Sequence, residues 1–346
     1  MSIDNSTSQQ STAITPEQIA DFACKPENME AFASVLEKVL PDYTRFIWGK
    51  PVAYKQFFTR WQKAGFTLYP NHYYSPIPDL TRLTSAQTSR RAGMAGIDLD
   101  TSAMLRLAES FHDRFVSEYA VFDKATRNSD AKFFFGNGVF ERIDAEILHC
   151  MIRNYRPKRL IEIGSGFSSL VTAAACELNR AEGHPVEFSL IEPYPNAFIR
   201  STLTGVSCLH RMGVEECPIE MFEELEEGDI LFIDSSHVIR SGNDVEYEYF
   251  EIIPRLKPGV IIHIHDIFLP FRYPENWIRD EHVFWNEQYL VEAMLMHNPS
   301  FKVLWAGCHM HTECPQRLAE WFPGYDPKFS LPGSLWMVRQ QSFSAL

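Results

Sequence analysis

The segment Leu160-Ile-Glu-Ile-Gly-Ser-Gly-Phe-Ser-Ser169 joins a short apolar run to a helical pattern through two glycines. The apolar run predicts a strand over residues 160–163. Because Gly164 and Gly166 lack side chains, the backbone can turn sharply there and a ligand can approach closely. A helix from about Ser168 to Asn179 would direct its free N–H groups at that ligand. The segment therefore predicts a strand, a ligand-binding turn and a helix.

Further apolar runs follow this segment and alternate with helical patterns, at residues 188–191, 230–233 and 260–264. Runs of this kind are typical of parallel strands buried on both faces of an α/β sheet. The C-terminal ends of the four predicted strands carry acidic residues, in turn Glu162, Glu192, Asp234 and Asp266. In an open α/β sheet the ligand crevice lies beyond the carboxyl ends of the strands, so these acids converge on one cleft. A role in helix capping accounts for one or two of them, but poorly for four.

The chain divides into three regions by composition and pattern. Residues 1–14 are rich in Ser, Thr and Gln, and we expect a disordered tail. Residues 15–130 look mainly helical: Thr15 and Gln18 match a capping box, and apolar spacing predicts helices over 51–64 and 102–119. Residues 131–346 hold the mostly parallel sheet, whose last two runs, 301–306 and 334–339, predict an antiparallel pair at its edge.

Composition narrows the class of protein. A net charge of −13 and the lack of a basic stripe argue against nucleic acid and anionic membranes as partners. The N-terminal sequence has no secretory signal pattern and no apolar run could span a bilayer, so we expect a cytoplasmic protein. The seven cysteines are odd in number and scattered, which suits reduced thiols. Four possible ligands lie within residues 308–314, but they lack the two separated pairs of a structural zinc site.

The glycine turn does not match a dinucleotide fingerprint, because Ser169 occupies the position of the third glycine. Instead, Glu162-Ile-Gly164-Ser165-Gly166 resembles the first motif of class I S-adenosylmethionine-dependent methyltransferases, an acid followed by two spaced glycines. The resemblance implies a Rossmann-like sheet with S-adenosylmethionine on this turn. It also implies that Glu192 holds the ribose hydroxyls of that cofactor. Asn137, between two glycines, is a further candidate for cofactor binding.

A second resemblance rests on Asp234-Ser-Ser-His237 and on His265-Asp266. These strand-end motifs are similar to those of a bacterial group that includes metal-dependent macrolide-sugar O-methyltransferases, with catechol O-methyltransferases as more distant relatives. The resemblance covers about residues 131–340. It implies that Asp234 and Asp266 bind magnesium and that His237 is the catalytic base.

His265 departs from that pattern, because the metal-binding relatives usually place an acid there. As a third ligand it would favour manganese, iron or zinc over magnesium. Alternatively, His265 is a base and no metal binds. His263, two residues earlier on the same strand, is expected to be buried structure.

The predicted chemistry is in-line transfer of a methyl group to a hydroxyl of a small molecule, sugar or glycan. An alcohol is a weak nucleophile until a base removes its proton or a metal lowers its pKa, which explains a His and acids in the cleft. The loop 268–277, with Arg272, Tyr273 and Trp277, would form the acceptor wall or a lid. The N-terminal helices would supply the opposite wall through Tyr73 and Tyr74, or a homodimer surface.

Two alternatives remain open at this point. One is a non-catalytic S-adenosylmethionine-binding protein that has kept the fold, although such a protein has no chemical use for the acids and the His. The other is a hydroxylase-like enzyme, because a cephalosporin hydroxylase-like group has similar strand-end motifs.

Overall fold

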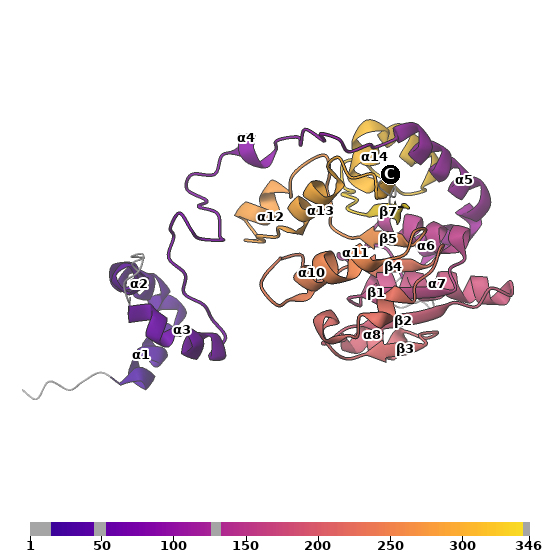
Figure 1. Ribbon diagram of the computed structural model, residues 1–346. Helices are drawn as coiled ribbons and strands as arrows, with labels where there is room; N and C mark the ends of the chain where they lie inside the picture. Colours follow the sequence, from indigo (N-terminus) through magenta and orange to yellow (C-terminus); the bar gives the residue numbers. More distant parts are fainter. Residues whose placement is uncertain (1–14, 45–52, 126–132, 342–346) are drawn as a thin grey trace, which may run out of the picture. The chain divides into compact units, whose positions relative to one another are not determined.

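A computed structural model describes residues 15–44, 53–125 and 133–341 of the chain (Figure 1). The chain forms two compact units, Met1–Arg82 and Leu83–Leu346. The predicted disordered tail, residues 1–14, lies outside the described residues. Where the structure describes the chain, no helix is long and apolar enough to cross a membrane.

The first unit is helical. It contains α1 (Pro16–Ala23), the short 3-10 helix η1 (Pro26–Asn28), α2 (Met29–Thr44) and α3 (Ala53–Lys63). The predicted capping box at the start of α1 is confirmed: the Gln18 backbone N–H donates to the Thr15 hydroxyl at 3.3 Å, and the Thr15 N–H donates to the Gln18 side chain at 2.9 Å. The predicted start of the third helix, at residue 51, lies outside the described residues.

The second unit is built on a seven-stranded sheet with the order β3-β2-β1-β4-β5-β7-β6. Its strands are β1 (Arg159–Ile163), β2 (Glu187–Ile191), β3 (Cys208–His210), β4 (Ile230–Ile233), β5 (Ile261–Ile264), β6 (Phe301–Ala306) and β7 (Leu335–Arg339). Strands β1 to β5 pair in parallel, and β7 runs antiparallel between β5 and β6. This confirms the predicted class of sheet and its antiparallel strand. The sequence pattern did not predict β3, which is only three residues long and largely solvent-accessible.

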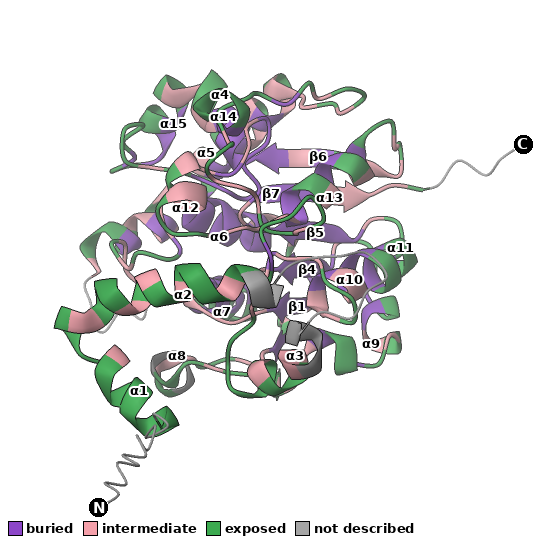
Figure 2. Ribbon diagram, turned by 90° about the vertical axis from the view of Figure 1, so that its left-hand side faces the viewer, coloured by how far each residue is buried: buried purple, intermediate pink, exposed green. Residues whose placement is uncertain are grey.

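Helices cover both faces of the sheet (Figure 1). The crossover from β1 to β2 runs through α7 on one face, and that from β4 to β5 runs through α10 and α11 on the other. The strands lie between these layers as the buried centre of the unit (Figure 2). Its α-helices are α4 (Ser85–Thr88), α5 (Thr101–Tyr119), α6 (Asp144–Tyr155), α7 (Phe167–Ala181), α8 (Ala197–Thr202), α9 (Glu220–Glu223), α10 (Asp244–Tyr247), α11 (Ile253–Arg255), α12 (Glu275–Arg279), α13 (Glu287–Leu295), α14 (Gly307–Glu313) and α15 (Pro315–Trp321). The remaining helical turns are η2 (Ala120–Lys124), η3 (Val214–Glu216) and the π-helical η4 (Glu248–Ile252).

Helix α5 belongs to the same compact unit as the sheet. Its apolar face, including Phe111 and Phe115, is buried, and its last residue, Tyr119, donates a hydrogen bond of 2.8 Å to the carbonyl of Trp321. The compact unit therefore begins at Leu83, whereas we predicted a helical region that extends to residue 130. The apolar spacing of α5 predicted a helix that packs on one side, but such spacing does not identify the element against which it packs.

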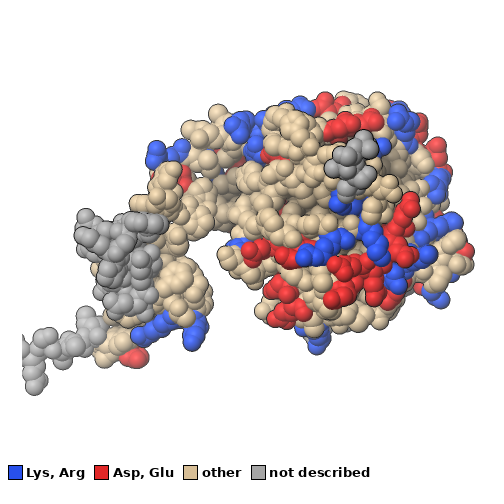
Figure 3. Space-filling view, viewed as in Figure 1, with Lys and Arg blue, Asp and Glu red and all other residues tan. Residues whose placement is uncertain are grey.

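Acidic and basic side chains are interspersed on the face of the second unit that is drawn in Figure 3.

Helices α5 and α6 are joined by charged side chains. Glu118 of α5 receives hydrogen bonds from His149 and Arg153 of α6, at 2.9 and 2.8 Å. These bonds join the two helices.

Candidate active site

The turn after β1 contains two glycines with different structural roles. At Gly164, φ is +88°, and a Cβ atom there would lie 2.0 Å from the backbone carbonyl oxygen of Asp234. Only glycine permits this close approach between the turn and the residue after β4. At Gly166 the backbone is extended, with φ at −164°, and a Cβ atom would meet no atom within 4 Å. Open space therefore lies beside Gly166, at the N-terminus of α7.

Glu162, predicted to bind the cofactor, lies beneath this turn. Its carboxylate is fully buried and accepts hydrogen bonds of 2.7 Å from the hydroxyls of Ser168 and Ser169. Burial raises the pKa of Glu162 to about 8. The contacts give Glu162 a supporting role, in which it fixes the start of α7 to the end of β1. Contact with the cofactor stays a prediction.

Glu192 and Ser165, both predicted to bind the cofactor, are hydrogen-bonded to each other. One carboxylate oxygen of Glu192 accepts from the Ser165 backbone N–H at 3.0 Å, and the other accepts from the Tyr194 N–H at 2.7 Å. The carboxylate is partly exposed at the end of β2. The structure thus brings Glu192 to the glycine turn.

Asn137 uses its side chain within its own loop. Its amide nitrogen donates to the carbonyls of Phe134 and Phe140, at 2.8 Å each. Its oxygen accepts from the backbone N–H groups of Val139 and Phe140, at 2.9 and 2.8 Å. Every hydrogen-bonding position of the amide is occupied. The structure therefore assigns Asn137 to loop organisation, and a contact with the cofactor remains untested.

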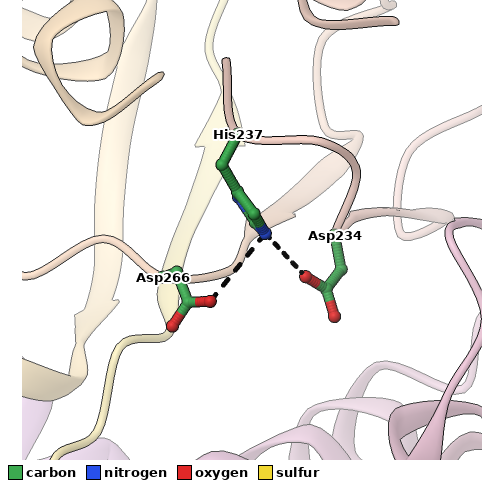
Figure 4. A group of neighbouring side chains, drawn as sticks. All are labelled: Asp234, His237 and Asp266. Atoms are coloured by element: carbon green, nitrogen blue, oxygen red, sulfur yellow. Dashed lines mark ion pairs between the residues drawn. The ribbon is translucent and has the colours of Figure 1, made fainter. Parts of the chain in front are cut away.

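Asp234, His237 and Asp266 meet at the carboxyl ends of β4 and β5 (Figure 4). The His237 Nε2 atom lies 3.2 Å from Asp234 Oδ1 and 3.8 Å from Asp266 Oδ2. Both His237 and Asp266 have left-handed backbone conformations, with φ at +58° and +54°. Such conformations are uncommon outside glycine and are concentrated at functional sites.

Charge governs the protonation of this group. Burial alone would lower the pKa of His237, but hydrogen bonds to Asp234 and Glu287 outweigh it and raise that pKa well above its ordinary value. Burial would likewise raise the pKa of Asp234, yet the charges of His265 and His237 lower it to about 2. Burial raises the pKa of Asp266. The hydrogen bonds to the two carboxylates therefore favour the protonated form of His237, and the positive charge in turn favours the ionised form of Asp234.

The three side chains form a possible metal-binding group, because one ligand atom from each lies within 4.8 Å of the others. Two carboxylates and one imidazole suit manganese, iron or zinc, and also magnesium that keeps much of its water. The predicted third ligand, His265, is not part of this group. It is buried, with Nε2 3.9 Å from Asp266 Oδ1 and with no described partner for Nδ1. Sequence spacing alone does not tell which histidine joins the two acids. His265 directly follows β5, whereas His237 lies three residues after Asp234.

Two other histidine predictions have a clear outcome. His263 is buried and stacks on Phe232 at a centroid distance of 4.1 Å, and burial lowers its pKa well below the ordinary value, as expected of a structural residue. In the segment 308–314, His309 contacts Thr101 and His311 contacts Tyr325, each at 2.8 Å. These contacts direct the two histidines to different partners.

Glu287, the first residue of α13, was not predicted to belong to the site. Its fully buried carboxylate contacts His237 Nδ1 at 2.8 Å and accepts from the Tyr249 hydroxyl at 2.8 Å. The Trp285 ring packs on the imidazole of His237 at a centroid distance of 4.3 Å. Nothing in the local sequence distinguishes this Glu, because it lies 50 residues beyond its partner.

A cavity of about 830 Å³ adjoins this group. Its lining includes His265, Asp266, Trp277 and Trp285, together with rings from Phe122, Phe135 and Phe329. Of the three aromatic-loop residues predicted for the acceptor wall, Trp277 lines this cavity, whereas Tyr273 is buried and Arg272 pairs with Glu292. Tyr73 and Tyr74, predicted for the opposite wall, belong to the first unit and are exposed.

Comparison with known proteins identifies the class. Residues 161–267, from β1 to just beyond β5, match the family model of the methyltransferase domain. An uncharacterised protein of Archaeoglobus fulgidus is 31% identical over 179 residues, which are 49% of this chain and 78% of that protein. Together with the sheet order and the glycine turn, these matches define a class I S-adenosylmethionine-dependent methyltransferase with a Rossmann-like sheet. Residues 161–267 belong to the methyltransferase domain family.

Solved structures are similar at lower levels. The SAH-bound methyltransferase PaMTH1 of Podospora anserina has 16% identity and a TM-score of 0.37, with 72% of this chain and 91% of that chain covered. The SAM complex of the O-methyltransferase TomG of Streptomyces achromogenes has 15% identity and a TM-score of 0.33, with 71% of this chain and 92% of that chain covered. At these values, the family assignment depends on the sequence matches.

Proposed function

We propose that this protein transfers a methyl group from S-adenosylmethionine to a hydroxyl group of a small molecule or a sugar-containing acceptor. One observation carries the proposal: the glycine turn lies directly against the backbone of Asp234, a member of the Asp234-His237-Asp266 group. Gly164 approaches the carbonyl of Asp234 so closely that no side chain fits between them. A donor on the turn would therefore present its methyl group beside the acids and the His.

The residues around the turn suit the donor. Open space beside Gly166 lets an elongated ligand lie along the backbone, and Glu192 offers a carboxylate to the ribose hydroxyls. Both features support the binding of S-adenosylmethionine at this turn.

The reaction displaces a neutral sulfide. The acceptor oxygen forms a bond to the methyl carbon, the carbon–sulfur bond breaks, and S-adenosylhomocysteine leaves with the electron pair. The hydroxyl proton moves to His237 Nε2, so the imidazole must enter the step in its neutral form. Because the neighbouring carboxylates raise the pKa of His237, turnover should rise with pH over the neutral range. A divalent cation held by Asp234 and Asp266 would lower the pKa of the acceptor hydroxyl.

The cavity disfavours an anionic acceptor. Most of the charged side chains in its lining are acidic: Asp123, Glu141, Asp144, Asp266 and Asp326. Its basic lining residue, Arg142, is already paired with Asp123 at 2.6 Å, donates to the carbonyl of Pro323 at 2.8 Å and lies over the Phe135 ring at 4.1 Å. An arginine bound on these sides is not available for an acceptor phosphate or carboxylate. Indole rings and carboxylates are common partners of sugar rings and hydroxyls, which favours a sugar-containing acceptor.

A methyl-transfer screen tests the proposal. Isotope-labelled S-adenosylmethionine is incubated with sugars, glycosides, sugar nucleotides and phenols, with and without Mg²⁺ or Mn²⁺, and labelled products are identified. We expect transfer to a hydroxyl and a loss of roughly a hundredfold or more in the His237→Ala variant, with donor binding retained. Donor binding without transfer to any acceptor would favour the non-catalytic alternative, and unchanged turnover in His237→Ala would refute the role of His237.

A further inference from the structure

We infer that Glu287 is a positioning residue for methyl transfer and acts by fixing the imidazole of His237. The inference rests on the proposed function in one respect, that His237 takes part in the reaction. The geometry that supports it is independent of any acceptor.

The backbone of His237 is fixed by the start of α13. Its carbonyl oxygen accepts hydrogen bonds from the N–H groups of Asn286 and Glu287, at 3.0 and 3.1 Å. The Asn286 side chain also accepts from the N–H of Ile239 at 2.8 Å. The two bonds to the His237 carbonyl satisfy N–H groups at the start of α13 that would otherwise lack partners within the helix. They also hold His237 in its left-handed backbone conformation, which is unfavourable for a residue other than glycine unless the surrounding structure enforces it.

The side chain of His237 is fixed on its far edge by Glu287. One oxygen of Glu287 binds Nδ1 and the other accepts from the Tyr249 hydroxyl, so both carboxylate oxygens are occupied and the group cannot rotate freely. Glu287 is fully buried, and Tyr249 and His237 are 7% and 5% exposed. The hydrogen bond at one imidazole nitrogen sets the orientation and the proton position of the other. Glu287 therefore directs Nε2 at Asp234 and Asp266.

Trp285 completes the arrangement and connects it to the acceptor cavity. Its indole packs on the His237 imidazole, contacts Trp277 at a centroid distance of 5.3 Å and lines the cavity. The imidazole is thus held at Nδ1 by Glu287 and on one face by Trp285. Only the Nε2 edge faces the two aspartates. A small displacement of α13 would misdirect Nε2, and a misplacement of about 1 Å can cost a factor of about a hundred in rate.

Two variants separate positioning from folding. Glu287→Gln preserves the side-chain shape but removes the charge and offers only one acceptor oxygen, so His237 and Tyr249 can no longer both donate to this side chain. Tyr249→Phe keeps the ring and removes the hydroxyl that fixes the second oxygen. Glu292→Gln is the matched control, because Glu292 is a buried carboxylate on the same helix that pairs with Arg272 instead. Thermal unfolding and calorimetry with S-adenosylmethionine identify any variant that has lost its fold.

A double-mutant cycle with His237→Ala provides the kinetic test. We expect Glu287→Gln to lower kcat by roughly tenfold to a hundredfold while KM for the donor and the acceptor changes less than about threefold. Tyr249→Phe should have a smaller effect, and Glu292→Gln none. In a His237→Ala background, Glu287→Gln should have almost no further effect, since there is no imidazole left to position. An equal effect of Glu287→Gln in both backgrounds would overturn the inference.

A spectroscopic measurement decides the same question without an acceptor. In protein labelled with ¹³C at its twelve histidines, the His237 Cε1–H signal should be displaced by the ring current of Trp285 and is assigned by its loss in His237→Ala. We expect this displacement to disappear in Glu287→Gln and to persist in Glu292→Gln. An unchanged signal in Glu287→Gln would contradict the positioning role. If the wild-type protein methylates no acceptor but the signal moves as expected, the proposed function fails and the positioning of His237 stands.

Discussion

The two glycines of the turn should respond in opposite ways to the same substitution. In Gly164→Ala, a side chain at φ +88° costs about 1–2 kcal/mol. The new methyl group would also lie 2.0 Å from the Asp234 carbonyl oxygen, and relief of such an overlap costs roughly a further 1–3 kcal/mol. The sum, about 2–5 kcal/mol, corresponds to a fall of roughly 4–20 °C in melting temperature for a unit of this size.

In Gly166→Ala the protein itself has room for the methyl group, so the melting temperature should stay the same or rise slightly. The methyl group would, however, occupy the space proposed for the donor. We expect the affinity for S-adenosylmethionine to fall at least tenfold, which is about 1.4 kcal/mol.

Thermal unfolding and isothermal titration calorimetry with S-adenosylmethionine measure both effects. Gly93→Ala is the control, because a Cβ atom there also meets nothing within 4 Å and Gly93 is remote from the turn in the sequence. That variant should match the wild type in both assays. Wild-type donor affinity in Gly166→Ala would refute the placement of the donor, and a wild-type melting temperature in Gly164→Ala would refute the close contact between the turn and Asp234.

Three further predictions follow from the charged groups. The pKa of Glu162 is raised from 4.5 to about 8, so its contribution to stability is complete below pH 4.5 and is lost as the pH rises towards 8. In urea unfolding, Glu162→Gln should therefore lose less stability than the wild type over that pH range. Parallel stability curves for the two proteins would contradict a buried neutral carboxyl group. Burial alone would raise the pKa of Glu118, but its hydrogen bonds from α6 lower that pKa from 4.5 to about 2. The wild type should therefore be more stable than Glu118→Gln above pH 4.5, by about 1–2 kcal/mol after solvent screening. This advantage should shrink as the pH falls towards 2. Mn²⁺ binding, measured by electron paramagnetic resonance, should weaken at least tenfold in Asp266→Asn; equal binding would place any cation elsewhere.

Most of the sheet could be predicted from sequence because its signals are local. Apolar runs of four or five residues mark strands buried on both faces, and a glycine pair after the first of them marks a ligand turn. The acids at the strand ends then meet because parallel strands share one edge. Asp234 and Asp266 were predicted in this way, whereas His237 was implied by the resemblance to the O-methyltransferase group; the three side chains lie together. Strand β3 was missed because it is short and lies at the edge of the sheet, where it pairs only with β2.

The remaining features depend on tertiary contacts that a sequence pattern does not contain. Glu287 reaches His237 only because α13 begins beside the loop after β4. The preference for His237 over His265 in the group of acids depends on the loop after β4, where His237 adopts a left-handed backbone conformation and its Nε2 lies 3.2 Å from Asp234 Oδ1. Asn137 looked like a ligand contact because glycines flank it, yet its amide is saturated by its own loop.

The central claim is that this site transfers a methyl group to oxygen with His237 as the base. The most direct measurement uses S-adenosylmethionine labelled with ¹³C in the methyl group and an acceptor from the screen, and follows the label by NMR in the wild type and in His237→Ala. We predict a new O-methyl signal that grows with time in the wild type and is at least about a hundredfold slower in the variant, at equal donor occupancy. A label that appears on nitrogen or carbon, or that appears equally fast in both proteins, would contradict the claim.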